Sequence, residues 1–173
     1  PNAQQIPRVG GVREVFVPSP GHVLYVVDFA ALELRTLAAV CLAKYGKSRL
    51  AEILKDKIDP HTYAYCQIQS RTLEDFAAWK QSDPDAAKSA RSRIKPIAFG
   101  VPGSMQARGL AHYAKRSYGQ ILTEEEAGQL RQGLINAFPE WKRVLAQAGD
   151  TVYTLTGRVR SKIKRAGQLF NTQ

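Results

Sequence analysis

The stretch from Val23 to Arg35 constrains the fold of this chain more than any other part of its sequence. Residues 23–27 are apolar and mostly β-branched, and the run ends on a single carboxylate, Asp28. Beyond Asp28 the apolar residues recur at intervals of three and four, which is the spacing of one face of a helix. The sequence therefore predicts a buried strand that meets a helix at Asp28.

An aspartate in this position has two interpretations. A carboxylate at the carboxyl end of a strand is well placed to hold a metal ion. Alternatively, Asp28 caps the following helix by accepting backbone N–H bonds. The stretch by itself leaves both roles open.

The rest of the chain is predicted to be mainly helical. Residues 12–17 and 22–27 are expected to form two strands of an antiparallel hairpin, joined by a turn at 18–21. Apolar spacing and capping residues predict helices over 31–43, 49–55, 60–68, 73–80, 86–99, 105–116 and 123–148, and then a strand over 151–155. Pro96 and Pro139 each predict a kink in their helix or the start of a new one. The predicted fold class is α+β, with a small antiparallel sheet and a larger helical region.

The charge of the chain indicates a polyanionic partner. Its 25 lysines and arginines outnumber 15 aspartates and glutamates, which gives a formal net charge of +10. The cations gather in 88–95 and 158–165, and this uneven distribution favours nucleic acid over a generic basic surface. No apolar run is long enough to predict a membrane span. Cys41 and Cys66 lie in apolar helical patterns and are expected to be free thiols in a reducing compartment.

One predicted helix carries a candidate binding face. Arg91, Lys95 and Phe99 are spaced four apart, so on a continuous helix they share one side. Two cations and an aromatic ring suit a phosphate group with a flat base beside it. The alternative is a solvated basic stripe over one core phenylalanine. His61, near the start of another predicted helix, is placed to donate to a phosphate oxygen.

Several segments, taken in order along the chain, resemble DNA polymerases of family A, the DNA polymerase I-like enzymes. Asp28 with Glu33-Leu34-Arg35 is similar to motif A, and Arg91, Lys95 and Phe99-Gly100 are similar to motif B on the O-helix of the fingers. The sequence Phe-Gly-Val-Pro-Gly in motif B is similar to that of phage-type members of the family. Further similar segments are Asn2–Arg8, Asp59-Pro60-His61, Thr154–Arg160 and Phe170-Asn171-Thr172.

The resemblance implies a palm and fingers architecture. Residues 1–43 would belong to the palm, with its small antiparallel sheet and motif A. Residues 44–150 would form the helical fingers subdomain, with the O-helix near 86–100, and residues 151–173 would return to the palm. The sequence lacks the His-Asp-Glu of motif C, which supplies a second metal-binding aspartate in the family, and it begins at Pro1 after the position of the thumb. We expect the chain to be the middle of a longer polymerase and inactive alone.

The resemblance also implies the chemistry of the motif residues. In the family the motif A aspartate holds two Mg²⁺ ions, so Asp28 and the carbonyl of Phe29 would be metal ligands. Glu33 would exclude a 2′-hydroxyl and so select deoxynucleotides. Three residues would grip the triphosphate, and a fourth would lie against the base and sugar. The residues that would bind the triphosphate are Arg91, His61 and Lys95, and the residue against the base and sugar is Phe99. Lys95 would also be catalytic.

The expected function is transfer of a nucleotidyl group from a deoxynucleoside triphosphate to a primer 3′-hydroxyl, directed by a DNA template. The residues expected to contact the template–primer or support the site are Gln4, Arg8, Arg158 and Asn171. The expected state is a monomer without membrane attachment, in the cytoplasm of a cell (its nucleoid, or a phage-infected cell), and an organelle is left open.

Three positions depart from the family pattern. Gly103 stands where motif B usually has a tyrosine, Pro96 follows the key lysine, and Ala31 stands where glutamine is common. Two other functions remain alternatives. A basic nucleic-acid-binding module without catalysis explains the charge, but it does not explain Asp28 with Glu33. A single-subunit RNA polymerase shares the palm, but Glu33 argues against it because such an enzyme must admit the 2′-hydroxyl.

Overall fold

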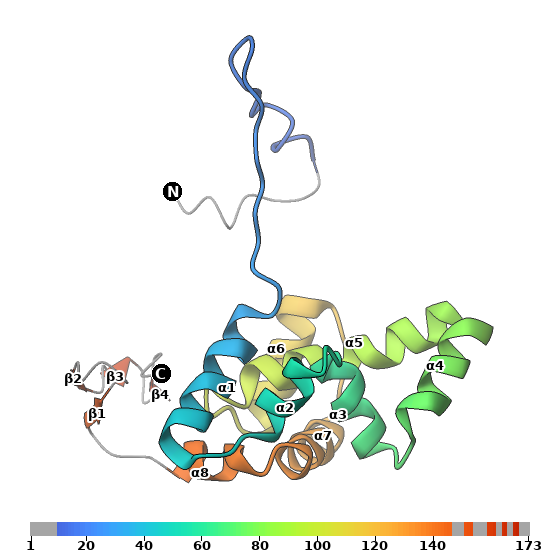
Figure 1. Ribbon diagram of the computed structural model, residues 1–173, viewed down its shortest axis with the longest axis vertical. Helices are drawn as coiled ribbons and strands as arrows, with labels where there is room; N and C mark the ends of the chain where they lie inside the picture. The colour runs from blue at the N-terminus through green and yellow to red at the C-terminus, as the bar shows by residue number, and fades with distance from the viewer. Residues whose placement is uncertain (1–9, 147–150, 154–158, 162–163, 166–167, 170–173) are drawn as a thin grey trace. The chain divides into compact units, whose positions relative to one another are not determined.

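The computed structural model describes residues 10–146, 151–153, 159–161, 164–165 and 168–169. The chain divides into two compact units, Pro1–Ala30 and Ala31–Gln173, and each is described by itself. The second unit contains all the helices of the described residues (Figure 1). These are α1 (Leu32–Tyr45), α2 (Arg49–Lys55), α3 (Pro60–Ile68), α4 (Leu73–Ser82), α5 (Pro84–Gly100), α6 (Ala107–Tyr118), α7 (Glu124–Ala137) and α8 (Glu140–Ala146).

The predicted α+β fold with a small antiparallel palm sheet is wrong. Residues 10–30 contain no strand, so the hairpin predicted over 12–17 and 22–27 is not formed. The strands of the described residues are short and lie near the other end of the chain. β1 (Thr151–Tyr153) pairs antiparallel with β2 (Val159–Ser161), and β3 (Lys164–Arg165) pairs antiparallel with β4 (Gln168–Leu169). They form two separate two-stranded ladders, and the fold is otherwise helical.

The failed hairpin has a physical reason. A strand needs a neighbour for its backbone hydrogen bonds, and an isolated two-stranded hairpin is marginal in water. Within the described residues, 22–27 has no neighbouring strand, and its apolar side chains are exposed, with Val26 at 94% and Tyr25 at 88%. Only the turn is present, where the backbone N–H of His22 donates to the carbonyl of Ser19 at 2.9 Å.

The helices begin close to where capping residues predict them. The side chains of Ser48, Asp59, Thr72 and Thr123 each accept a backbone N–H from the first turn of the helix that follows. Thr72 and Thr123 also belong to capping boxes, in which an acidic side chain three residues later accepts from the cap backbone. Each such cap typically stabilises a helix by about 1 kcal/mol.

The two interior prolines have different outcomes. The helix predicted over 123–148 splits at Pro139 into α7 and α8. Helix α5 instead continues through Pro96 to Gly100. It therefore carries the predicted binding face on one uninterrupted element, which packs against α3, α4, α6 and α7.

One hydrophobic core joins α1, α2, α3, α5, α6, α7 and α8. Its fully buried side chains include Leu50, Ile97, Leu110, Leu134 and Trp141. A smaller cluster of Cys66, Phe76 and Ala87 lies beside Trp79 on α4. Both cysteines are free and buried, as expected. This core fixes α3 and α5 against each other, and they carry most of the predicted site.

A buried carboxylate ties α8 to the start of α2. Glu140 is 7% exposed, and its Oε1 accepts the hydroxyl of Ser48 at 2.8 Å and the backbone N–H of Leu50 at 2.9 Å. Ser48 in turn accepts the backbone N–H of Ala51 at 3.1 Å. Glu140 therefore satisfies donors at the amino end of α2 that have no partner inside the helix.

Candidate functional site

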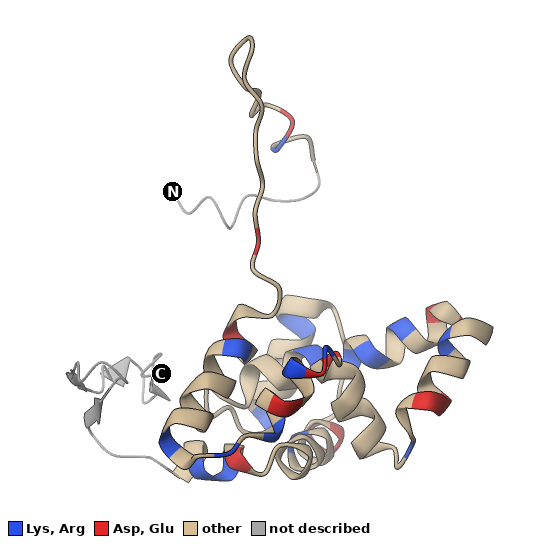
Figure 2. Ribbon diagram, in the orientation of Figure 1, with Lys and Arg blue, Asp and Glu red and all other residues tan. Residues whose placement is uncertain are grey.

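Helices α3 and α5 bring four of the sequence-predicted residues together. The α3–α5 cluster consists of Asp59 and His61 at the start of α3, and Arg91, Lys95 and Phe99 on α5. The α5 residues are four apart and share one face, because α5 is continuous between them. Cations are spread along this helix (Figure 2). The cluster thus joins two segments that lie about thirty residues apart in the chain, as the 32-residue separation of Asp59 and Arg91 shows.

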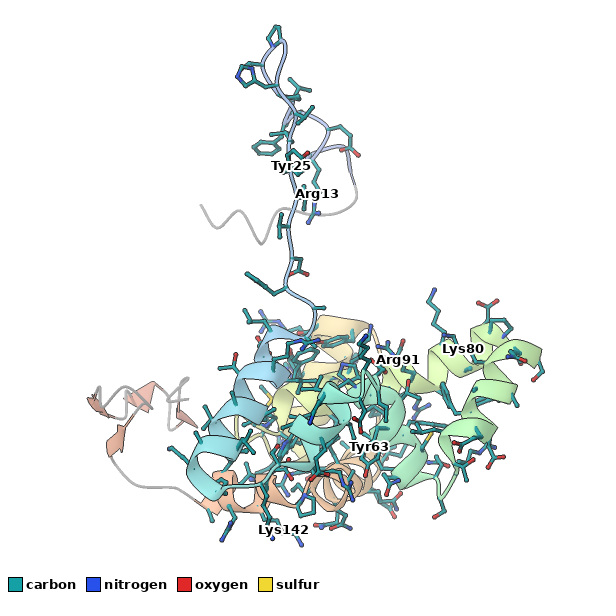
Figure 3. The ribbon with its side chains drawn as sticks, in the orientation of Figure 1. Arg13, Tyr25, Tyr63, Lys80, Arg91 and Lys142 are labelled. Atoms are coloured by element: carbon teal, nitrogen blue, oxygen red, sulfur yellow. The ribbon has the colours of Figure 1, made fainter. Side chains whose placement is uncertain are left out.

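Asp59 and Arg91 form a two-pronged ion pair (Arg91 is labelled in Figure 3). Arg91 donates through Nε to Oδ2 of Asp59 at 2.7 Å and through a terminal nitrogen to Oδ1 at 2.6 Å. The same carboxylate accepts the backbone N–H and the hydroxyl of Thr62, both at 2.8 Å. Burial alone raises the pKa of Asp59, but these bonds outweigh it and lower the pKa to about 2. The pair therefore stays ionised and fixes the guanidinium plane.

His61 lies in the interior of this cluster. It is 7% exposed, and its ring centroid lies 5.8 Å from that of Phe99, with the rings tilted at 56°. Its Nδ1 is buried and has no hydrogen-bond partner among the described residues. Burial, with the positive charges of Arg91 and Lys95, lowers the pKa of His61 to about 4 although Asp59 opposes the shift. The imidazole is neutral at pH 7.

Lys95 supplies the remaining charge of the cluster. It is half-buried, and its ammonium is close enough to His61 to affect its pKa. Within the part of the chain that the structure describes, Lys95 forms no ion pair, whereas the charge of Arg91 is offset by Asp59. The arrangement offers one uncompensated cation, a fixed guanidinium and an aromatic ring, which suits an anionic ligand with a flat apolar part.

The motif A residues are divided between the two units of the chain. Asp28 and Phe29 are exposed and belong to the unit Pro1–Ala30. Asp28 does not occupy the cap position of α1, which is held by Ala31 in the left-handed conformation at φ 52°. Glu33 lies in the first turn of α1 and is exposed. Burial, a hydrogen bond with Tyr113 and, less strongly, the charge of Glu33 raise the pKa of Tyr118.

Comparison with known proteins settles the family. A sequence model described as DNA polymerase family A matches residues 1–170 of the chain. The chain belongs to this family. It is similar to DNA polymerase I of Aquifex aeolicus (strain VF5), with 32% identity over 167 residues that make up 91% of this chain and 26% of that protein.

Two further relatives of this family A chain are more distant. DNA polymerase I of Caldicellulosiruptor bescii is 27% identical over 164 residues, or 90% of this chain and 17% of that protein. DNA polymerase I of Rhizobium leguminosarum is 26% identical over 168 residues, or 91% of this chain and 15% of that protein. The family A chain thus spans about a quarter or less of the length of these relatives.

The donor set of the family A chain does not by itself make a magnesium site. Among the described residues, no group of three or more histidine, cysteine, aspartate or glutamate side chains could hold a metal ion. Asp28 and the Phe29 carbonyl are two oxygen donors, and Mg²⁺ prefers six in an octahedron, several of them water. Two donors on an exposed segment fit part of such a site only.

The structure does not describe the four residues that were predicted to contact DNA. Gln4, Arg8, Arg158 and Asn171, predicted to contact DNA, lie outside the described residues. No helix within the described ranges has both the length and the apolar character of a membrane span.

Gly100, which the sequence places in motif B, is a packing position. A Cβ there would lie 2.4 Å from Cδ2 of the fully buried Leu110.

Sequence reasoning missed one member of the cluster. The sequence predicts Asp59 as the cap of α3 and as part of the segment Asp59-Pro60-His61, but it does not predict the pairing of Asp59 with Arg91. An acidic cap 32 residues before a basic helix carries no local signal of contact, because the pairing depends on how α3 packs against α5. The motif that places Asp59 two residues before His61 was the nearest available sign.

Proposed function

We propose that the protein carrying this chain performs template-directed DNA synthesis, and that the α3–α5 cluster binds the triphosphate of the incoming deoxynucleotide. The observation that carries this proposal is the convergence of His61, Arg91, Lys95 and Phe99 from two helices in one cluster. Membership of DNA polymerase family A supports the reaction class. The reaction forms a bond from the primer 3′-oxygen to the α-phosphorus and releases pyrophosphate.

The cations of the cluster would have distinct tasks. Lys95, which has no ion pair among the described residues, contributes net positive charge to a phosphate group and stabilises the charge that develops during transfer. Arg91 reaches the ligand with its guanidinium already oriented by Asp59. Because two of its nitrogens are engaged, Arg91 orients the triphosphate more than it neutralises it.

The neutral His61 and the ring of Phe99 would complete the pocket. A neutral imidazole donates one hydrogen bond and adds no charge, so His61 serves as a directional contact to a phosphate oxygen. Phe99 is half-buried and lies against His61, and it offers an aromatic surface to the base and sugar. We assign Glu33, in the first turn of α1, to the exclusion of a 2′-hydroxyl.

Asp28 and the Phe29 carbonyl are proposed as two ligands of the Mg²⁺ ions used in the reaction. The described residues do not complete that site. We therefore propose that the 173-residue chain alone does not extend a primer, and that Gln4, Arg8, Arg158 and Asn171 contribute contacts to the template–primer in a complete enzyme. Primer extension by the isolated chain with Mg²⁺ would contradict this assignment. The proposed subdomains are palm for 1–43 and 151–173 and fingers for 44–150, in a monomer that acts in the cytoplasm or nucleoid.

The decisive experiment is Asp28→Ala in the full-length protein. Primer extension should fall by at least about a thousandfold, because a metal ligand supplies several kcal/mol of transition-state stabilisation. Binding to template–primer, measured by fluorescence anisotropy, should stay within about twofold, since DNA affinity rests on many phosphate contacts. Asp56→Ala removes an exposed carboxylate at the end of α2 and is the matched control. Unchanged synthesis by Asp28→Ala would refute the proposed function and leave a nucleic-acid-binding module.

A further inference from the structure

Helix α5 contains a proline that leaves one of its carbonyl groups without a helical partner. In a regular helix the N–H of residue 96 donates to the carbonyl of residue 92, but Pro96 has no N–H. The helix nevertheless runs from Pro84 through Pro96 to Gly100. The carbonyl of Ser92 therefore needs a donor from elsewhere, because an unpaired backbone acceptor shielded from water is costly.

Gln120 provides that donor. Its side-chain amide nitrogen lies 2.9 Å from the carbonyl oxygen of Ser92, in a partly buried bond. Gln120 is itself held at the end of α6, where Gly119 adopts the left-handed conformation and the backbone N–H of Gln120 donates to Ala114 at 3.1 Å. A carbonyl can only accept, so the amide nitrogen and not the amide oxygen must face Ser92.

The oxygen of the same side-chain amide is less well satisfied than its nitrogen. The Oε1 atom of Gln120 is buried and has no hydrogen-bond partner among the described residues. An exposed glutamine would satisfy both ends with water. Gln120 leaves one acceptor unpaired while its nitrogen satisfies Ser92, so the bond to α5 is the one that its place in the fold secures.

This bond lies at the turn of α5 that carries the cations of the cluster. Ser92 directly follows Arg91, and Pro96 directly follows Lys95. Any unwinding of that turn would shift Lys95 relative to His61, which is fixed on α3. The donor that prevents it comes from the connection between α6 and α7, outside both helices of the cluster.

We propose that Gln120 is a positioning residue for nucleotide binding, which replaces the backbone donor that Pro96 lacks and so holds Arg91 and Lys95 in register with His61. The inference rests on the proposed function of the α3–α5 cluster. It assigns to Gln120 an indirect role, exerted through the carbonyl of Ser92.

The two residues form a reciprocal test. Pro96→Ala restores the backbone donor and makes the amide of Gln120 redundant. Gln120→Leu removes the donor at similar volume, and Gln120→Glu keeps the shape but, when ionised, offers only acceptors. The full-length wild type, Gln120→Leu, Pro96→Ala and the double variant form a cycle that isolates the coupling between the two positions.

Binding of the complementary deoxynucleoside triphosphate to enzyme with template–primer is measured by fluorescence titration, alongside steady-state kinetics. We expect Gln120→Leu to raise Kd about tenfold and to lower kcat as well, because the misplaced Lys95 contacts both the bound triphosphate and the charge that develops during transfer. Gln120→Glu should be at least as impaired. In the double variant, Kd should return to within about twofold of Pro96→Ala. Gln132→Leu removes an exposed amide that bonds Asn136 on α7, and it should leave Kd unchanged.

Two results would overturn the inference. One is an unchanged Kd in Gln120→Leu, and the other is an equal rise in Kd whether residue 96 is proline or alanine. Failure of the proposed function looks different, because then the wild type itself binds no nucleotide. Hydrogen exchange of the α5 backbone amides, measured on the same four proteins without nucleotide, gives a second test. Protection lost in Gln120→Leu and restored in the double variant supports replacement of the donor, and unchanged protection contradicts it.

Discussion

The α3–α5 cluster and the segment Gly10–Ala30 both carry residues that the sequence marks for chemistry, but their side chains have different surroundings. In the cluster, Asp59, Arg91 and His61 are fixed by ion pairing, capping and burial within the described residues. In the segment, the apolar residues around Asp28 are exposed, and residues 10–30 form no strand. The side chains of a sequence motif are thus held in a defined arrangement only where packing and hydrogen bonds fix them.

Among the tests of this comparison, the largest expected effect concerns the charge of the cluster. Lys95→Ala in the full-length protein should lower kcat/KM for deoxynucleotides about a hundredfold, because a charge-assisted contact to phosphate is lost. Steady-state primer extension measures it. Lys115→Ala, an exposed lysine on α6, is the matched control and should have little effect. Equal behaviour of the two variants would show that the cluster is only a solvated basic stripe.

The second prediction compares a glycine from each region. In Gly100→Ala the new Cβ would lie 2.4 Å from Leu110, whose fully buried side chain has little room to move. The 173-residue chain should lose about 3 kcal/mol of unfolding free energy in urea. Gly21→Ala meets no atom within 4 Å and adds only the strain of φ +78°, about 1 kcal/mol, in a segment without a core. Similar losses at both positions would break the comparison.

The third prediction uses the pH dependence of the cluster. The pKa of His61 is about 4 in the folded state and 6.5 ordinarily, so the unfolded chain takes up its proton first. The stability linked to His61 is therefore complete above about pH 6.5 and falls by about 3 kcal/mol as the pH drops to 4. Urea unfolding at a series of pH values measures it.

The dependence in this window should disappear in His61→Gln. It should persist in His112→Gln, which changes an exposed histidine on α6. Asp59 acts in a lower window, because its pKa is depressed to about 2 and its stabilisation is lost only as the pH falls from about 4 toward 2. A wild-type profile that is flat between pH 6.5 and 4 would show that His61 is open to water.

The smallest expected effects come from one substitution made in both regions. Valine and threonine have the same shape, so Val→Thr tests burial alone. Val101→Thr places a hydroxyl at a fully buried position at the end of α5 and should cost about 1.5 kcal/mol in thermal unfolding. Val26 is 94% exposed, and Val26→Thr should change stability by less than about 0.5 kcal/mol. A larger loss at Val26 would mean that the segment makes stabilising contacts.

Local signals in the sequence were sufficient for the helices and insufficient for the sheet. Ser48, Asp59, Thr72 and Thr123 act as caps through bonds to their own first turns, so their role can be read from neighbouring residues. A strand is completed by another strand, and the pattern of 22–27 does not reveal whether one is present. The same limit applies to β1, of which Thr151–Tyr153 was predicted correctly while Thr154 and Leu155 lie outside the described residues.

The site was predictable to the extent that one helix carries it. The shared face of Arg91, Lys95 and Phe99 follows from their spacing once α5 is continuous, and the place of His61 near the start of a helix made it a candidate for the same phosphate. The pairing of Asp59 with Arg91 and the bond from Gln120 to Ser92 depend on tertiary packing. Pro96 in the sequence indicates that one backbone hydrogen bond of the helix is missing, but it does not indicate which residue replaces the donor.

The buried bond between Ser48 and Glu140 has a consequence for the order of folding. It joins residues 92 apart, so it forms only after a long loop has closed and the entropy of that closure has been lost. Most contacts of α2 with α1 and α3 are nearer in sequence and can form earlier. The amino end of α2 should therefore be secured late, after the main folding barrier. Weakening Glu140 should accelerate unfolding and leave the refolding rate nearly unchanged.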